Sequence, residues 1–283
     1  MDALSIKARI KKKFKRFIDF LSSKVANTYL GDLIITSLLQ VSTEVYHKNC
    51  RLLFCSANRL MSYRANTFSN KEPETLEWID AFKEGSVLWD IGANVGLYSI
   101  YAAKSKLCKV YAFEPSIFNL EFLARNIVLN KLEGMVAIIP SAVSSTSGVN
   151  TLFQTTMEWG GALSTFEKNI GWDGNSINDI FSYKTLGISM DDFVTLAGID
   201  YPDYIKVDVD GLEHYILQGG GNVLKSVKEI LIEVNDAFSA QSLGVSSILS
   251  SHGFEMVAKK HAESFCGTKF EETYNQIWSR VIG

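Results

Sequence analysis

The sequence predicts an α/β protein built on a doubly wound parallel sheet, and three observations support this prediction. First, residues 87–90 form a short apolar strand pattern, and a turn with glycines separates it from a helix pattern that begins at Leu97. Second, strand and helix patterns alternate from there towards the C-terminus, as they do in folds made of βαβ units. Third, 283 residues are enough for one large α/β domain with an N-terminal extension.

Each predicted element follows from its local pattern, a short apolar run for a strand and apolar residues three or four positions apart for a helix. After the first strand we expect strands over residues 110–113, 136–139, 204–208, 229–234, 254–258 and 275–281, and helices over 117–130, 212–224 and 245–252 with another from residue 190. Before it we expect a buried helix over residues 33–45, a strand over 51–55 and a helix over 73–82. Residues 150–185 lack clear periodicity, which is typical of a functional or mobile segment.

The turn after the first strand is the strongest candidate for a ligand site. Gly92 and Gly96 have no side chain that would keep a ligand off the backbone, and the helix that follows points unpaired N–H groups into the same space. The dinucleotide fingerprint requires glycines at its first, third and sixth positions, which here are Gly92, Asn94 and Leu97. An NAD-dependent oxidoreductase or epimerase is therefore the weaker enzyme hypothesis.

Two acidic residues narrow the ligand class. Asp90 ends the first strand, where its carboxylate would repel a pyrophosphate but suit an ammonium or sulfonium group. Glu114 ends the second strand, 22 residues after Gly92, at the distance where an acid in this architecture reaches ribose hydroxyls. An adenosine with a cationic tail fits both acids, and S-adenosylmethionine is such a ligand.

Three stretches resemble, in this order, the FkbM family of S-adenosylmethionine-dependent methyltransferases: residues 90–99 (DIGANVGLYS), 113–116 (FEPS) and 205–213 (IKVDVDGLE). The resemblance covers roughly residues 64–280. It implies a Rossmann-like methyltransferase fold whose seven-stranded, mostly parallel sheet has an antiparallel last strand. The expected enzyme transfers a methyl group from S-adenosylmethionine to an acceptor oxygen.

The resemblance also divides the chain and assigns its site. We expect a helical N-terminal extension or small subdomain over residues 1–63 and the cofactor-binding methyltransferase domain over 64–283. Ser141 and Ala142 follow the third core strand, at the sheet edge where ligands bind in this fold, and should approach the adenine. The full set of expected cofactor contacts is Asp90, Gly92, Asn94, Gly96, Glu114, Ser141, Ala142 and Asp208.

Three residues after the fourth core strand are the expected catalytic groups. Asp208 should face the methyl-bearing end of the cofactor, as a contact or as an electrostatic partner of the transferred methyl. Glu213 matches a position of the family motif and would hold the cofactor or orient the acceptor, whereas His214 has a pKa suited to a base. The alternatives are that Glu213 is a structural acid in the first turn of the helix and that His214 is a surface residue.

A metal is not expected, although one alternative stays open. A calcium loop over Asp208, Asp210 and Gly211 fails, because alignment on that glycine puts Lys206 and Leu217 at positions that require acids. A divalent ion held by Asp208 and Asp210 is the alternative that the sequence leaves open.

The resemblance suggests an acceptor hydroxyl on a sugar, glycan or related metabolite. Aromatic residues with polar neighbours, such as Trp159, Trp172 and Phe181 in the irregular segment, would form its platform, or else pack beneath a loop. Arg64 and Glu72 are secondary candidates, because the segment before the first strand often closes over the cofactor in this class. A catalytically silent scaffold is the alternative from another functional class, and the intact acids oppose it.

Composition and the N-terminus bear on partners. The 28 basic and 31 acidic residues nearly cancel, so no nucleic-acid partner is expected, and four cysteines without a paired pattern fit a cytoplasmic protein. No apolar run reaches the roughly 18 residues that span a bilayer. Residues 1–25 instead predict an amphipathic helix, which would either contact an anionic membrane peripherally or pack on the catalytic domain or a partner subunit. The sequence makes no prediction of oligomeric state.

Overall fold

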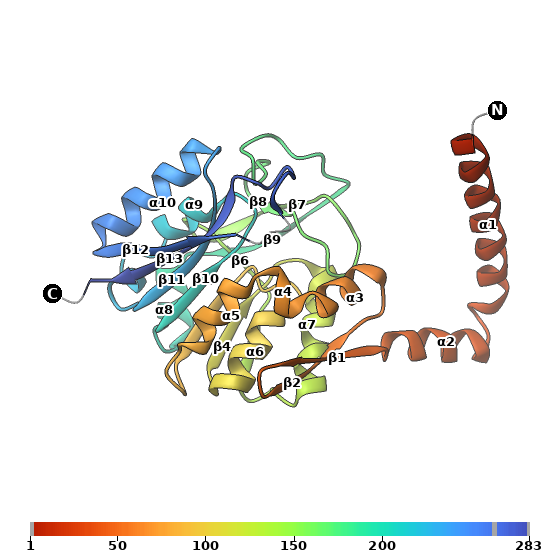
Figure 1. Ribbon diagram of the computed structural model, residues 1–283, viewed down its shortest axis with the longest axis horizontal. Helices are drawn as coiled ribbons and strands as arrows, with labels where there is room; N and C mark the ends of the chain where they lie inside the picture. Colours follow the sequence, from red (N-terminus) through yellow and green to blue (C-terminus); the bar gives the residue numbers. More distant parts are fainter. Residues whose placement is uncertain (1–2, 262–264, 282–283) are drawn as a thin grey trace.

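The computed structural model describes residues 3–261 and 265–281. Its centre is a seven-stranded sheet in the order β12 (Phe254–Lys260), β13 (Thr273–Arg280), β11 (Glu229–Asn235), β10 (Tyr204–Val207), β3 (Val87–Ile91), β4 (Lys109–Phe113) and β5 (Val136–Ile139). The strands from β11 to β5 pair in parallel, whereas β13 is antiparallel to both of its neighbours. The predicted doubly wound, mostly parallel sheet with an antiparallel last strand is confirmed (Figure 1).

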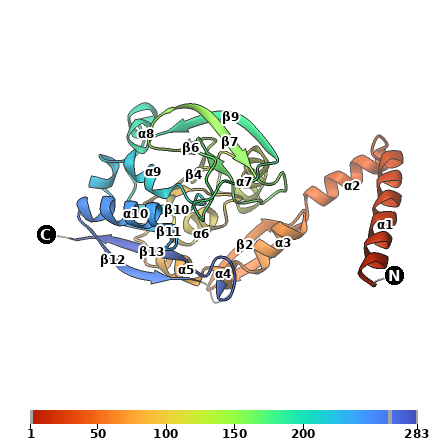
Figure 2. The same cartoon turned by 90° about the horizontal axis from the view of Figure 1, so that it is seen from above.

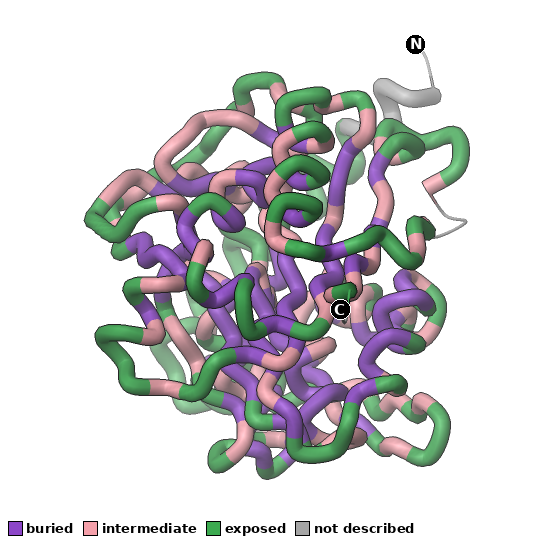
Figure 3. The backbone as a smooth tube through the Cα atoms, turned by 90° about the vertical axis from the view of Figure 1, so that its left-hand side faces the viewer, coloured by how far each residue is buried: buried purple, intermediate pink, exposed green. Residues whose placement is uncertain are grey.

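Helices cover both faces of this sheet, because successive strand residues point to opposite sides. Leu88 packs in the core with α5 (Pro73–Asp80), α6 (Leu97–Lys106) and α7 (Ile117–Asn130). Its neighbour Trp89 packs in the second core with α8 (Met190–Ala197), α9 (Glu213–Gln218), the short 3-10 helix η1 (Val223–Lys225) and α10 (Ser239–Ser251). Buried residues are concentrated in the interior of the molecule and exposed residues at its periphery (Figure 3).

The segment expected to be irregular, residues 150–185, contains strands, so that prediction was wrong in part. A four-stranded sheet runs β6 (Ala142–Val143), β9 (Phe181–Ile188), β7 (Gly148–Gln154) and β8 (Thr165–Phe166). Strands β7 and β9 lie some thirty residues apart in the sequence. No local periodicity therefore reveals the pairing that stabilises the two strands. The stretch from β8 to β9 remains a loop.

The N-terminal region also differs from the prediction. Helices α1 (Ala3–Val25) and α2 (Tyr29–Leu39) extend away from the rest of the molecule, and residues 42–45, expected to end a buried helix, lie in a strand (Figures 1 and 2). That strand, β1 (Ser42–His47), forms a hairpin with β2 (Cys50–Cys55), since its β-branched residues pair across to β2. Helices α3 (Arg59–Asn66) and α4 (Phe68–Lys71) then lead to α5.

The hairpin shares a core with the catalytic sheet. Leu52 and Phe54 of β2 are buried in the same cluster as Leu88. Asn126 and Asn130 of α7 hydrogen-bond to the β2 backbone at Cys55 and Leu53, which fixes the hairpin to the helix layer. Within residues 1–63, α1 and α2 are thus the part that stands apart from the body, and the expected division between residues 63 and 64 stays a prediction.

The helix expected over residues 212–224, with residues 219–221 interrupting it near its end, stops at Gln218, just before these glycines. A Cβ on Gly219 would lie 2.4 Å from the carbonyl oxygen of Ser144, and one on Gly220 would lie 2.1 Å from Cε of Met190. The glycines therefore end the helix where the chain passes against two neighbouring segments, and only glycine allows this close approach.

Candidate functional site

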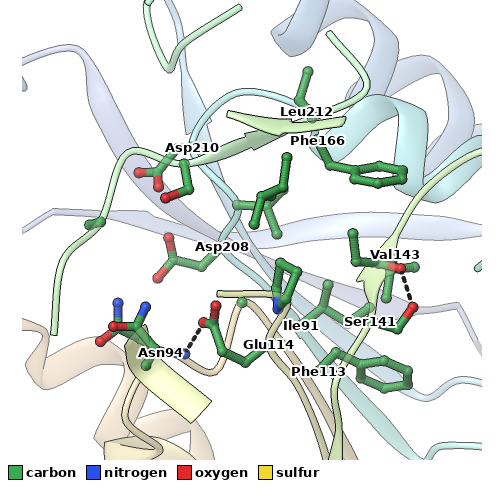
Figure 4. Close-up of a pocket in the computed structure, with 18 of the residues that line it drawn as sticks. Ile91, Asn94, Phe113, Glu114, Ser141, Val143, Phe166, Asp208, Asp210 and Leu212 are labelled. Carbon is green, nitrogen blue, oxygen red and sulfur yellow. Dashed lines mark hydrogen bonds between the residues drawn. The ribbon is translucent and has the colours of Figure 1, made fainter. Parts of the chain in front are cut away.

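A hollow opens at the carboxyl ends of β3, β4 and β10, where ligands bind in doubly wound sheets. It brings together six of the residues expected from the sequence: Gly92, Asn94, Glu114, Ser141, Ala142 and Asp208. Figure 4 shows the side chains of Asn94, Glu114, Asp208 and Asp210 pointing towards one space from three different segments. We call this space the first hollow.

The Gly92 turn is packed tightly against the end of β10. Gly92 has a φ of +84°, and a Cβ there would lie 1.9 Å from the carbonyl oxygen of Asp208. The N–H of Asp208 in turn donates to the carbonyl of Ile91 at 3.0 Å. Gly96 starts α6 with a φ of +83° and faces Leu123 instead of the hollow, so the structure gives it a packing role.

Glu114 is anchored by the backbone of that turn. Its carboxylate accepts the N–H of Asn94 at 2.8 Å and the N–H of Ser116 at 2.7 Å. Burial raises the pKa of Glu114 to about 7. Each oxygen accepts one backbone N–H and retains acceptor capacity, as a group that binds hydroxyls requires.

A loop crosses the mouth of the first hollow. The side-chain amide groups of Asn94 and Asn119 both donate to the carbonyl of Gly161, at 2.7 and 3.1 Å. The N–H of Leu163 donates to Asp210 Oδ2 at 2.7 Å. Residues 159–163 are therefore tied to the turn after β3 at one end and to the segment after β10 at the other.

Asp90 lies below the hollow and does not line it. It is 1% exposed and accepts a hydrogen bond from Ser99 Oγ at 2.5 Å, while its other oxygen has no hydrogen-bond partner among the described residues. Burial raises the pKa of Asp90, and the ammonium group of Lys206 opposes this effect. The cofactor contact expected of Asp90 stays a prediction.

Lys206 is the buried cation of the site. It is 2% exposed, and its Nζ lies 2.7 Å from Asp208 Oδ2 and 5.2 Å from the ring centroid of Tyr98. Burial lowers its pKa, but the carboxylates of Asp208, Asp90 and Glu72 outweigh burial and raise it. Lys206 therefore stays charged and balances the acids around it.

Three acids form a cluster that includes Asp208, the ion-pair partner of Lys206. Carboxylate oxygens of Asp208, Asp210 and Glu233 all lie within 4.8 Å of one another, an arrangement that could hold a metal ion. Burial, followed by the charge of Asp208, raises the pKa of Asp210 to about 6. Burial and the same two aspartates raise the pKa of Glu233 well above its ordinary value.

Glu213 and His214 do not line the first hollow. Glu213 is fully buried and accepts hydrogen bonds from the N–H groups of Val209 and Gly211, so it braces the segment that carries Asp208 and Asp210. Gln241 donates to the same carboxylate. Glu213 is thus placed to position other residues, and burial raises its pKa to about 7.

His214 is packed between α9 and α10, and its role as a base is not supported by the structure. The centre of its ring lies 4.1 Å from that of Tyr215. A Cβ added to Gly244 of α10 would lie 3.0 Å from the Cβ of His214. Burial and the charge of Lys168 lower its pKa. Because α9 turns this side chain towards α10, His214 does not line the first hollow, which the sequence alone did not show.

A second hollow adjoins the first and shares five of its residues, Gly92, Asn94, Ala162, Asp208 and Asp210. Its remaining walls are Arg64, Lys71, Leu163, Trp172, Glu233, Phe265 and Phe270. The rings of Trp172 and Phe270 lie 4.6 Å apart. Arg64, a secondary candidate from the sequence, thus lies in this hollow, whereas Glu72 is buried behind it in an ion pair with Lys71 at 2.8 Å.

The aromatic residues expected as a platform are divided between different places. Trp172 lines the second hollow and Phe166 the first. Trp159 packs on Phe122 at 4.9 Å, and Phe181 packs beside Tyr183 at 5.6 Å. Phe265 and Phe270, from the loop between β12 and β13, were missed, because nothing local to that loop indicates that it folds back over the site.

The strand order, the antiparallel β13 and the acid-lined hollow at the carboxyl ends of β3, β4 and β10 define the Rossmann-like class of methyltransferases. Residues 90–256 match the family model described as "Methyltransferase FkbM domain", which covers more than half of the chain. The chain therefore belongs to the FkbM family of methyltransferases, and its cofactor is S-adenosylmethionine.

Two named relatives agree with this assignment. The hexuronic acid methyltransferase AglP of Haloferax volcanii is 28% identical over 157 residues, which are 56% of this chain and 59% of AglP. The 31-O-demethyl-FK506 methyltransferase FkbM of Streptomyces tacrolimicus is 26% identical over 213 residues, 67% of this chain and 80% of that protein. A solved structure, the methyltransferase FkbM from Methylobacillus flagellatus KT, is 13% identical with a TM-score of 0.49, over 78% of this chain and 52% of the other. The matches to AglP and to this structure span less than two thirds of their lengths.

Proposed function

We propose that this chain methylates a hydroxyl group on a sugar, a glycan or a related metabolite. The observation that carries the proposal is the contact between the two hollows, which share the wall formed by Asp208 and Asp210. A donor in the first hollow and an acceptor in the second would meet at this wall. Such a placement supports in-line transfer, because alignment of the reactants supplies much of the rate.

The first hollow fits the cofactor. Glu114 would accept hydrogen bonds from the ribose hydroxyls, Ser141 and Ala142 would lie beside the adenine, and Asp208 would face the reacting end. Gly92 leaves no room for a Cβ, so the backbone forms this wall of the hollow. When bound, S-adenosylmethionine supplies a methyl group that its sulfonium charge has already activated.

The second hollow has the chemistry of a site for a polyhydroxylated acceptor. Trp172 and Phe270 offer ring faces for C–H surface, and the carboxylates at the shared wall offer acceptors for hydroxyls. Arg64 adds positive charge, which would suit an acidic sugar such as the hexuronic acid in the name of AglP. FkbM, by its name, acts on an O-demethyl form of FK506, which supports oxygen as the target atom.

The acceptor proton needs a base close to the shared wall. Asp210 lines both hollows, and its pKa of about 6 lies near the range in which a carboxylate acts as a base at neutral pH. We assign the proton transfer to Asp210, with Asp208 as the electrostatic partner of the transferred methyl. His214 is not part of this arrangement.

The test is calorimetric titration with S-adenosylmethionine, S-adenosylhomocysteine and NAD, followed by methyl transfer to a panel of neutral and acidic sugars. We expect only the two adenosyl ligands to bind, more weakly in Glu114→Ala, whereas Glu133→Ala, which removes an exposed acid, binds like the unaltered chain. Asp210→Asn should retain binding and lose turnover. Binding without transfer to any sugar, together with transfer to a non-sugar hydroxyl or to nitrogen, would refute the proposed acceptor.

A further inference from the structure

Helices α1 and α2 form an arm with almost no packing on the catalytic body. The side chains of residues 9–24 are all exposed, and both views show α1 well clear of the sheet and its helices (Figures 1 and 2). The expectation that this helix packs on its own catalytic domain is therefore wrong for the described residues. No described helix is long and apolar enough to cross a membrane.

The arm presents an apolar face and a basic face. Ile10, Phe14, Phe17 and Leu21 follow one another at helical spacing and are 61%, 64%, 55% and 42% exposed. Residues 9–24 contain seven basic residues, Arg9, Lys11, Lys12, Lys13, Lys15, Arg16 and Lys24, against the single acid Asp19. By helical spacing, Lys11 and Lys13 flank the apolar face, whereas Lys12, Lys15 and Arg16 lie on the opposite side.

Helix α2 extends this apolar surface at an angle. A Cβ on Gly31 would lie 2.1 Å from the carbonyl oxygen of Val25, so a glycine is required for α2 to start against the end of α1. Thr28 caps α2 by accepting the N–H of Gly31 at 3.2 Å. The exposed apolar residues of α2 are Tyr29, Leu30, Leu33, Ile34, Ile35 and Leu38. The groove between the helices is lined mostly by Leu21, Val25, Ile34 and Ile35.

We propose that this arm binds the chain to the surface of an anionic membrane. An apolar face flanked by lysine and arginine matches the boundary between acyl chains and negatively charged headgroups. Two copies of α1 packed face to face would bring like charges together. Moreover, residues 1–40 hold 8 basic and 3 acidic residues, a net +5, so the remaining 20 basic and 28 acidic residues give −8. The arm therefore carries a net positive charge, whereas the rest of the chain carries a net negative charge.

The experiment is co-sedimentation of the full-length chain with vesicles of phosphatidylcholine alone or mixed with phosphatidylserine. We expect binding to the mixed vesicles only, and weaker binding at high salt because ions screen the attraction. Replacing Lys12, Lys15 and Arg16 by Glu should lower the affinity by roughly 100-fold or more. Phe14→Ser combined with Phe17→Ser should abolish binding.

Matched control variants carry the same kinds of substitution on the catalytic body instead of the arm. Lys83→Glu, Lys131→Glu and Lys225→Glu change the net charge equally, and Val149→Ser with Leu243→Ser removes two exposed apolar side chains. Both controls should bind as the unaltered chain does, and cofactor affinity should be the same in every variant. The proposal fails if the folded chain ignores anionic vesicles, or if arm and body variants behave alike. It also fails if sedimentation velocity shows a dimer that the arm variants dissociate, because the apolar face then covers a second copy.

Discussion

The contact between Gly92 and Asp208 predicts a large difference between two glycine-to-alanine substitutions. Gly92 and Gly85 both have positive φ, +84° and +74°, so alanine at either position is strained by about 1–2 kcal/mol. Around Gly85 a new Cβ would meet nothing within 4 Å. At Gly92 it would meet the Asp208 carbonyl oxygen at 1.9 Å.

The additional destabilisation at Gly92 follows from how that carbonyl is held. The Asp208 N–H donates to the Ile91 carbonyl, so the residue that carries the clashing carbonyl is held against the end of β3. Overpacking of this kind destabilises by about 1–3 kcal/mol beyond the backbone strain. We therefore expect Gly92→Ala to lower the free energy of unfolding by about 2–5 kcal/mol and Gly85→Ala by about 1–2 kcal/mol.

Urea denaturation measures both values on the same chain, and calorimetry with S-adenosylhomocysteine measures the functional effect. A shift of the turn by a few tenths of an ångström to 1 Å would misplace Glu114 and Asp208 together, so affinity should fall on the order of 100-fold in Gly92→Ala only. Equal loss of stability in the two variants, or unchanged affinity in Gly92→Ala, would show that the turn is not confined by Asp208 as described.

Three further predictions follow from the buried acids and His214. Between about pH 4.5 and pH 7 the folded chain keeps protons on Glu114 and Glu213 that the unfolded chain has lost. The free energy of unfolding should therefore fall as pH rises through this window. The variant Glu213→Gln should flatten the curve of unfolding free energy against pH. His214→Gln should leave kcat and its pH profile unchanged, since the ring does not line the hollow; a loss of turnover with normal KM would contradict that placement. Methyl transfer should continue in EDTA, because Lys206 already neutralises Asp208, and activity that disappears with EDTA and returns with Mg²⁺ would instead assign the three-carboxylate cluster to a metal.

The sequence predicted the parts of the fold that local patterns determine. The strand, glycine turn and helix from Val87 to Lys106 depend on neighbouring residues only, and so does the placement of Glu114 at the end of the next strand. The positions of Ser141 and Asp208 followed from a rule of the fold, that parallel strands end at one edge. These residues do line the first hollow.

What the sequence missed depends on contacts between distant segments. The pairing of β7 with β9 forms only when residues some thirty positions apart come together. The direction of the His214 side chain depends on how α9 packs against α10. For that reason Glu213 contacts the segment after β10, whereas its neighbour His214 contacts α10. Lys206 shows the same limit, since its role depends on the acids that surround it in space.

The hydrogen bonds of Asn94 connect the two proposed ligand sites. Its backbone N–H holds Glu114, and its side chain holds the loop at Gly161, whose neighbour Ala162 lies between the hollows. If the cofactor engages Glu114, these hydrogen bonds connect that carboxylate with the loop beside the proposed acceptor space. Coupling of this kind is reciprocal, so each ligand would change the affinity for the other by the same factor.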